Sequence, residues 1–168
     1  MVDLQNAPWA FNQMQGTKIV DASHDQDTTD LHKCVVYISD FFDLQISNLC
    51  IVVVGALGGH EIGNINVLYR FSTIRIILLN DDCLIQLLPR SHHHEIHVKP
   101  SILGPHCGLV PVGMPSTNRT TTGGLQWDLN NTKMEFGGLI STSNIAKGQI
   151  VTVHSDTDLI WTISIRKT

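Results

Sequence analysis

The stretch Leu159–Arg166, which reads LIWTISIR, carries the clearest alternation of apolar and polar side chains in the chain. Leucine, tryptophan and two isoleucines fall on one face of an extended segment. Threonine, serine and arginine fall on the other face, interrupted only by Ile160. Because successive side chains of a β-strand point to opposite faces, the stretch predicts a strand with one buried face and one face open to solvent or a partner.

Similar runs rich in β-branched residues, separated by turn residues, cover most of the chain from residue 33 onward. Asn80–Asp82, Asn130–Thr132 and Ser155–Asp158 each predict a hairpin turn between two such runs. The pattern predicts an all-β fold, a single-domain antiparallel β-sandwich or jelly-roll-like barrel. The predicted strands are Lys33–Ser39, Asn48–Val54, Ile65–Leu79, Cys83–Leu88, Glu95–Lys99, Leu109–Val112, Leu125–Leu129, Lys133–Leu139, Gln149–His154 and Leu159–Arg166.

The first thirty residues depart from this pattern and predict a separate N-terminal arm. Asp3–Gly16 contains Trp9 and Phe11, and we expect a short helix or an apolar arm that docks onto a neighbouring subunit. Asp21–Asp30 is polar and acidic, which indicates a loop. We therefore divide the chain into an N-terminal arm and loop, residues 1–30, and a β-sandwich domain, residues 31–168.

Charged residues are scarce: they make up 15% of the 168 residues, against about 25% in ordinary soluble domains. A domain with so few charges is expected to bury part of its surface against other copies, as a homo-oligomer or a lattice. A neutral exterior rich in serine, threonine and asparagine is the alternative. The net charge is −4 and the basic residues are scattered, so no arm for direct contact with nucleic acid is predicted.

Nothing in the sequence predicts a leader peptide or a membrane-spanning segment. The longest apolar run, Leu49–Leu57, is about half the roughly 20 residues that a helix needs to cross a bilayer. The four cysteines are far apart and form no CxxC pair, which indicates a reducing environment. We expect an intracellular protein, in the cytoplasm of a host or the interior of a virion.

The segment Arg90–Lys99 concentrates titratable side chains and is the first place to look for metal or acid–base chemistry. On a strand, His93, Glu95 and His97 would share one face, and the other two histidines of the run would share the opposite face. Three interpretations stay open: a solvated sheet edge, a pH-sensitive contact at an assembly interface, and a site for one divalent transition metal. The interface would use Trp9, Phe11, His93, Glu95 and His97, whereas the metal site would use His92, His94, His97 and His106.

Two other motifs are less specific. A His-x-His strand also begins the metal site of cupin barrels, but no histidine closely follows the Pro111–Gly113 turn, where that family has its second set of ligands. The cupin family is therefore not assigned. Gly55–Gly59 follows an apolar run but lacks both the G-x-G-x-x-G spacing and a predicted helix behind it. We expect a flexible hairpin loop there rather than a nucleotide site.

Few charges, many apolar strands and an apolar arm together favour a self-assembling structural protein. We predict a viral-type matrix or shell (capsid) subunit of a virion, non-catalytic and without a cofactor. Two alternatives stay open. One is a metal-dependent, cupin-like β-barrel enzyme that uses the His92–His97 cluster, and the other is a carbohydrate-binding β-sandwich module that presents an exposed tryptophan.

Overall fold

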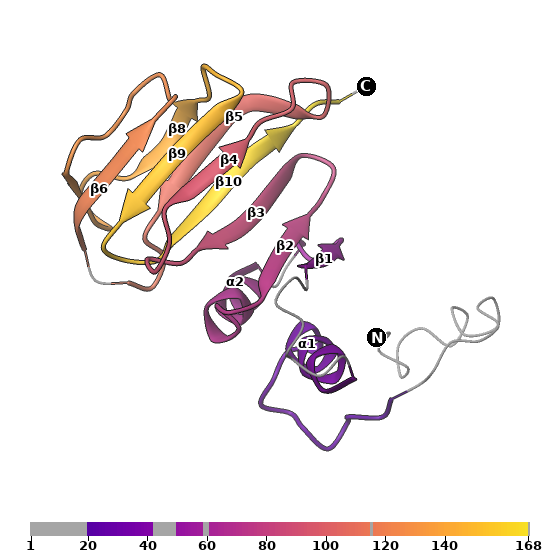
Figure 1. The fold of residues 1–168 in the computed structure, drawn as a ribbon. Coiled ribbons are helices and arrows are strands. Elements are labelled where there is room, and N and C mark those ends of the chain that lie inside the picture. The colour runs from indigo at the N-terminus through magenta and orange to yellow at the C-terminus, as the bar shows by residue number, and fades with distance from the viewer. Residues whose placement is uncertain (1–19, 42–49, 59–60, 115, 168) are drawn as a thin grey trace.

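The structure is a computed structural model and describes residues 20–41, 50–58, 61–114 and 116–167. Within these ranges the chain forms two helices and ten strands (Figure 1). In chain order they are α1 (Asp30–Phe41), β1 (Cys50–Val54), α2 (Glu61–Arg70), β2 (Arg75–Leu79), β3 (Cys83–Leu88), β4 (His94–His97), β5 (Leu103–Val110), β6 (Thr117–Gly123), β7 (Thr132–Met134), β8 (Ser141–Ile145), β9 (Ile150–Ser155) and β10 (Leu159–Ile165).

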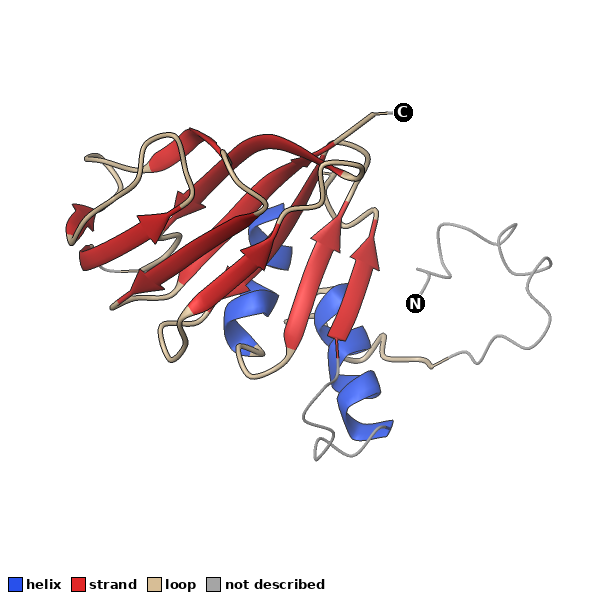
Figure 2. Cartoon of the chain, turned by 45° about the horizontal axis from the view of Figure 1, so that its top comes forward, coloured by secondary structure: helices blue, strands red, loops and turns tan. Residues whose placement is uncertain are grey.

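The strands form two sheets with a shared core (Figure 2). The larger sheet has the order β1-β2-β3-β10-β5-β8, and the smaller has the order β4-β9-β6-β7. Strands β1 and β2 run parallel, whereas the other described pairs are antiparallel. The predicted β-rich, two-sheet architecture is thus confirmed only in its coarse form. The larger sheet is mixed, two helices accompany it, and the strands do not close into a single barrel.

The predicted strand at the C-terminus exists as β10, but both of its faces are buried. Leu159 and Trp161 are fully buried between the sheets, where they pack with Val151 and Val153 of β9. Ile160 points to the other face and joins a second core under the helices. Burying a large apolar side chain stabilises a fold by about 1.5–3 kcal/mol, so the apolar residue that interrupts the alternation has a packing role.

Helix α1 forms where Lys33–Ser39 predicted a strand, so that prediction is wrong. Leu31, Val35 and Ile38 recur at helical spacing and pack into the core beside β1 and β2. The Thr29 Oγ1 atom accepts a backbone N–H of the first turn at 3.2 Å, which caps the helix. Tertiary packing and the cap therefore outweigh the strand preference of the β-branched residues.

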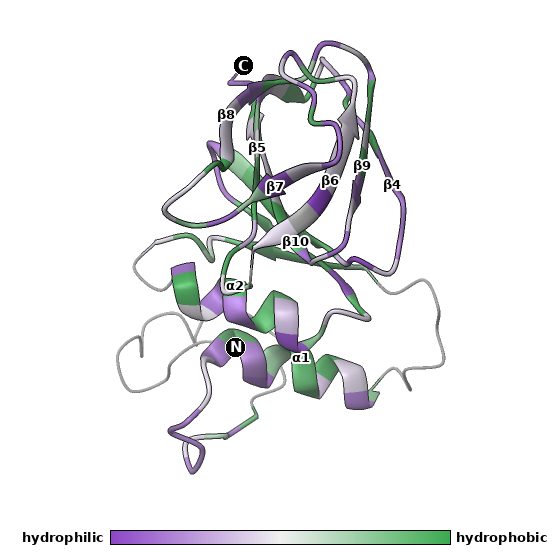
Figure 3. Cartoon of the chain, turned by 90° about the vertical axis from the view of Figure 1, so that its left-hand side faces the viewer, coloured by the Kyte–Doolittle hydropathy of each residue, from purple (hydrophilic) through white to green (hydrophobic). Residues whose placement is uncertain are grey.

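Helix α2 occupies the first half of the predicted strand Ile65–Leu79, which is also wrong. Parallel neighbours such as β1 and β2 cannot be joined by a tight hairpin and need a crossover, which α2 supplies. Val67 and Leu68 are buried against the larger sheet. Helices α1 and α2 lie next to each other beneath the strands (Figure 3). The loop that begins at Gly55 therefore leads from a strand into a helix and is not a hairpin.

The predicted turns fare unequally. The Asn80–Asp82 hairpin is confirmed, because β2 and β3 pair directly across it and Asn80 Oδ1 accepts the backbone N–H of Cys83 at 2.7 Å. The Ser155–Asp158 hairpin is wrong, because β9 belongs to the smaller sheet and β10 to the larger one. The Leu125–Leu129 strand is wrong as well, since only an isolated bridge forms there, between Leu125 and Ala146.

The predicted N-terminal arm, with Trp9 and Phe11, lies outside the described residues. Residues 20–29 form turns that lead into α1, and the proposed division of the chain at residue 30 stays a prediction. Among the described helices, none has the length and apolar character that a bilayer crossing requires.

Candidate functional site

A cleft of about 720 Å³ lies between the start of α1 and the carboxyl end of β1. Asp25, Thr28 and Asp30 line one side of it, and Gly55 and Asn64 line the other. The Asn64 Nδ2 atom donates to the backbone carbonyl of Ala56 at 2.6 Å, which ties the loop after β1 to α2. The cleft therefore has one acidic wall and one wall made of a strand end.

The acidic loop is organised by Asp25. Its carboxylate accepts the backbone N–H groups of Asp27 and Thr28 at 2.9 and 3.2 Å, and it also accepts the Thr28 hydroxyl. These bonds, led by the one from the Thr28 side chain, lower the pKa of Asp25 below its ordinary value. The Asp30 side chain is 66% exposed and lies 4.0 Å from Lys33 Nζ, measured from Oδ1. Asp30 thus leaves carboxylate oxygens open to the cleft.

The carboxyl end of β1 is open to the same cleft. Gly55 has a φ of 77°, a conformation that only glycine adopts easily, and a side chain built there would meet open space. Its N–H continues the ladder to the Leu79 carbonyl at 3.0 Å. In open sheets with parallel strands, ligands bind outside the carboxyl ends of the strands, so the position of this cleft fits a ligand site.

A second candidate site lies at the opposite edge of the larger sheet, around Trp127. Trp127 is 56% exposed, whereas Asn144 of the edge strand β8 is only 3% exposed. The Trp127 backbone N–H donates to Asn144 Oδ1 at 3.2 Å, and Asn144 Nδ2 donates to the Trp127 carbonyl at 2.8 Å. Asp128 supports the same turn, because its Oδ1 accepts the Leu125 N–H at 3.1 Å and the Thr122 hydroxyl at 2.9 Å. The exposed indole therefore stands on a rigid base.

The two candidate sites are far apart in one chain. The cleft adjoins β1 and the Trp127 turn adjoins β8, and these strands are the two edges of the six-stranded sheet. Neighbouring strands lie about 4.8 Å apart, so five spacings separate the edges by about 24 Å. Figure 1 shows α1 and the strands β6 and β8 toward opposite ends of the molecule.

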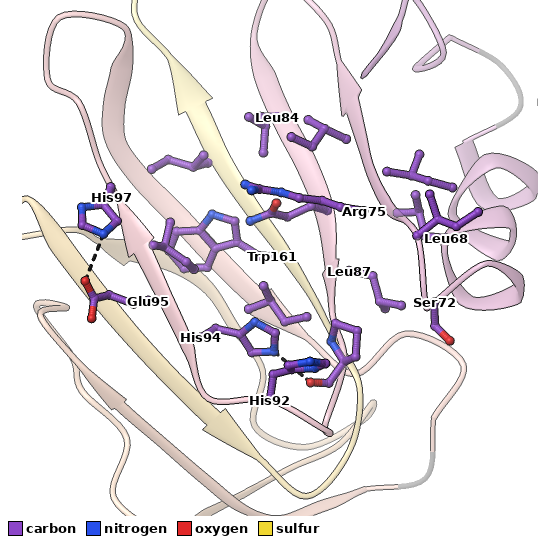
Figure 4. Close-up of a pocket in the computed structure, with 18 of the residues that line it drawn as sticks. Leu68, Ser72, Arg75, Leu84, Leu87, His92, His94, Glu95, His97 and Trp161 are labelled. Carbon is purple, nitrogen blue, oxygen red and sulfur yellow. Dashed lines mark hydrogen bonds and ion pairs between the residues drawn. The ribbon is translucent and has the colours of Figure 1, made fainter. Parts of the chain in front are cut away.

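The histidine run begins just before β4 and continues along it, at the edge of the smaller sheet. His97 Nε2 lies 3.0 Å from Glu95 Oε1, and both side chains are exposed (Figure 4). The His94 Nε2 atom is 2.8 Å from the Pro89 carbonyl on the inner side. His93 stacks on His154 of β9, with ring centroids 3.8 Å apart. The structure thus brings together part of the predicted interface set, whose other members, Trp9 and Phe11, lie outside the described residues.

The histidines of the predicted metal site do not converge. His106 is exposed on β5 of the larger sheet, where it pairs with Ile145 of β8. His92 and His94 instead lie at the edge of the smaller sheet. Across the described ranges, no three His, Cys, Asp or Glu side chains are placed so that they could hold a metal ion. Among the residues that the structure describes, the histidine cluster therefore does not form a three-ligand metal site.

Two family models match the chain in succession. The thiamin pyrophosphokinase catalytic domain matches residues 4–78, and the thiamin pyrophosphokinase vitamin B1 binding domain matches residues 93–160. Thiamin pyrophosphokinase 1 from Caenorhabditis elegans is 31% identical over 166 residues, which cover 93% of this chain and 67% of that relative. This chain belongs to the thiamine pyrophosphokinase family.

Plant relatives are more similar but longer. Thiamine pyrophosphokinase 2 from Arabidopsis thaliana is 63% identical over 157 residues, which cover 91% of this chain and 58% of the relative. The chain thus spans less than two thirds of the length of the plant relatives it matches. The crystal structure of thiamine pyrophosphokinase from Bacillus subtilis superposes with a TM-score of 0.72 at 23% identity, over 85% of this chain and 66% of that one. This likeness shows that the fold is shared.

Family membership overturns the functional predictions made from the sequence. The family is one of enzymes, so the prediction of a non-catalytic viral matrix or capsid subunit is wrong. The cupin-like enzyme and the carbohydrate-binding module are wrong as well, because both family models that match the chain are those of thiamin pyrophosphokinase. The low content of charged residues and the apolar strands indicate only that much of the surface is buried or neutral. They do not distinguish a self-assembling structural protein from an enzyme.

Neither candidate site is predicted from the sequence, although the sequence holds a signal for each. The sequence predicts a strand around Trp127, but the pair Gly123–Gly124 just before it is a turn signal, and Gly124 has a φ of 87° in the structure. The sequence predicts the acidic segment only as a loop, because it predicts a strand where α1 forms. With α1 and α2 assigned as helices, Gly55 would have stood between a parallel strand and a helix, which is where nucleotide sites occur.

Proposed function

We propose that this chain contributes to the transfer of a pyrophosphoryl group from ATP to thiamine. In the proposal, the region of residues 93–160 holds thiamine at Trp127, and the cleft between α1 and β1 faces the nucleotide. The observation that carries the proposal is the exposed Trp127 indole, held by the buried Asn144 inside the stretch that matches the vitamin B1 binding domain.

The chemistry of thiamine suits this indole. Thiamine carries a flat pyrimidine ring and a positively charged thiazolium ring. Flat rings stack on an indole face, and a cation over that face is attracted by its electron density. Because Asn144 fixes the backbone of Trp127, little freedom is lost when a ligand stacks on it.

The acidic cleft suits the nucleotide. Mg²⁺ that accompanies nucleotide phosphates takes oxygen ligands, commonly one or two carboxylates together with the phosphates. The Asp30 carboxylate lines the cleft and is open to it, so it is the residue that would hold the ion, which would neutralise phosphate charge. Asp25 already accepts three hydrogen bonds and would instead keep the loop in place.

A second copy of the chain would complete the site. The thiamine hydroxyl oxygen must approach the β-phosphorus of ATP to about 3–3.5 Å before AMP can leave. The two candidate sites of one chain lie about 24 Å apart across five strand spacings. Val52 and Val54 beside the cleft are 54% and 76% exposed. Two exposed apolar side chains on one strand support contact with another copy of the chain at this surface. The predicted homo-oligomer is therefore retained as a proposal, with the Trp127 site of one copy facing the cleft of another.

The test is product formation by the full chain with thiamine, ATP and Mg²⁺. We expect thiamine pyrophosphate and AMP in equal amounts, with W127A lowering the rate at least about tenfold. F136A, which removes another exposed aromatic side chain of the same region, serves as the matched control and should stay within about twofold. A chain that binds thiamine without forming product contradicts the catalytic part, and one that does not bind thiamine contradicts the whole proposal.

A further inference from the structure

A second cavity, of about 640 Å³, opens at the mouth of the β-sandwich, and neither the acidic loop nor Trp127 lines it. Its floor is formed by β2, β3 and β10, and its side wall by the segment His92–His97 (Figure 4). Most small-molecule sites occupy about 300–1,000 Å³. The cavity is therefore large enough for a ligand of one or two rings.

The floor of this cavity contains an unsatisfied hydrogen-bond donor. Trp161 is fully buried, yet its indole Nε1–H has no acceptor among the described residues. Buried tryptophan N–H groups nearly always find a partner. Because Trp161 lines the cavity, a ligand with an acceptor atom is one way to satisfy this donor.

A row of side chains across three strands adds polarity next to the indole. Gln86 of β3 is directly opposite Trp161 of β10, and Ile77 of β2 is directly opposite Gln86. Gln86 is 8% exposed and lines the same cavity. Arg75 lies two residues before Ile77 and hence on the same face. The floor thus combines an indole N–H, an amide and a guanidinium within an otherwise apolar surface.

Arg75 gives the cavity its charge preference. Its side chain is exposed and lines the cavity (Figure 4), and within the described ranges no carboxylate lies within ion-pair distance of it. The Glu95 carboxylate on the side wall is already engaged by His97. A guanidinium binds carboxylate and phosphate groups through paired hydrogen bonds, so an anionic group is the complement of Arg75.

The part of the side wall around His94 is suited to a ring. His94 is half-buried, and burial lowers its pKa below the ordinary value, so its imidazole is neutral at pH 7. Leu88 and Ile163 contribute apolar surface below it. A flat ring could therefore occupy the space between the imidazole and the floor without burying an unpaired charge.

We propose that this cavity binds a small aromatic or heteroaromatic anion, whose carboxylate or phosphate pairs with Arg75 and whose acceptor atom receives the Trp161 Nε1–H. This site is separate from the thiamine and nucleotide sites proposed above and does not depend on them. A carboxylate and a phosphate would pair with Arg75 in the same way, and the choice of probe distinguishes these two ligand classes.

The experiment follows the indole N–H signals of the full chain by ¹⁵N NMR during titration with nicotinate or pyridoxine 5′-phosphate. The three tryptophan signals are assigned with the W9F and W127F variants. We expect the Trp161 signal to shift saturably with a Kd of about 1 mM or tighter for at least one probe, and the better probe identifies the anionic group. If the Trp161 signal does not move with either probe, the proposal is wrong.

Two control variants distinguish a specific binding site from nonspecific electrostatic attraction of anions. R75Q should weaken the better probe at least about tenfold, because the guanidinium pairing is lost. R70Q removes a positive charge from α2, outside the cavity, and should change binding by less than about twofold. Equal binding by R75Q and the unmodified chain contradicts the proposal, and so does an identical shift with inorganic phosphate alone.

Discussion

Asn144 and Trp127 hold each other through a reciprocal pair of hydrogen bonds, from the Trp127 N–H to Asn144 Oδ1 and from Asn144 Nδ2 to the Trp127 carbonyl. The same amide also receives the Ile145 N–H at 2.9 Å and donates to Ser141 Oγ at 3.1 Å. One buried side chain of β8 thus positions the turn that carries the exposed indole.

Asn144→Ala should weaken both the fold and thiamine binding. It removes the partners of buried backbone groups, and an unsatisfied buried group costs about 1–3 kcal/mol. We expect a loss of that size in the free energy of unfolding, measured by urea denaturation, together with a thiamine Kd raised at least about tenfold. Ser143→Ala, at an exposed position next to it, should leave both values unchanged. Equal effects of the two variants would show that Asn144 does not position Trp127.

Asp30→Asn should weaken binding of Mg²⁺-ATP, because a neutral amide is a poorer ligand for a hard cation than a carboxylate. We expect about a tenfold higher Kd for Mg²⁺-ATP, measured by calorimetry, and little change for thiamine. Asp81→Asn in the β2–β3 turn is the matched control, since it removes an exposed carboxylate far from the cleft in the sequence and outside its lining. If the Asp30 variant bound Mg²⁺-ATP as tightly as the unmodified chain, the nucleotide site would not be at this cleft.

Stability should fall as the pH decreases below about 6.5, because burial lowers the pKa of His94 in the folded state. The unfolded chain, with the ordinary pKa of 6.5, then binds the proton more tightly than the folded chain does. The contribution of neutral His94 is present above pH 6.5 and is lost as the pH falls through the folded pKa. Thermal unfolding between pH 5 and 8 measures this dependence. His94→Gln should flatten it, whereas His106→Gln should not.

Val54→Asp should weaken self-association. Val54 is 76% exposed on the edge strand β1, where an apolar side chain favours contact with another chain. We expect a lower average mass by light scattering, or a higher concentration needed for association. Ile102→Asp changes another exposed apolar residue, before β5, and should have no such effect. A full chain that is monomeric at every concentration would contradict the second-copy proposal.

The sequence predicts several strands of the β-sandwich half, among them β3, β4, β9 and β10, because alternation is a local signal, but it does not predict β6 or β8. The Asn80 turn reports pairing between two strands that are neighbours in sequence. The alternation that ends the chain reports the strand β10 itself, but not its partners, which are the distant strands β3 and β5. The helical half was missed because Val35 and Ile65 have strand preferences, and only packing against the larger sheet makes them helical. The candidate sites were missed because each is assembled by distant residues. Asn144 reaches Trp127 across 17 positions, and no spacing in the sequence signals this contact.

The most direct test of the central claim is a thiamine titration of the full chain, followed by the indole N–H signal of Trp127 in ¹⁵N NMR. We predict that the Trp127 signal shifts saturably as thiamine stacks on the indole, while the buried Trp161 signal keeps its position. A Trp127 signal that stays in place while thiamine binds, or that does not respond because thiamine fails to bind, would contradict the claim that Trp127 is the thiamine platform.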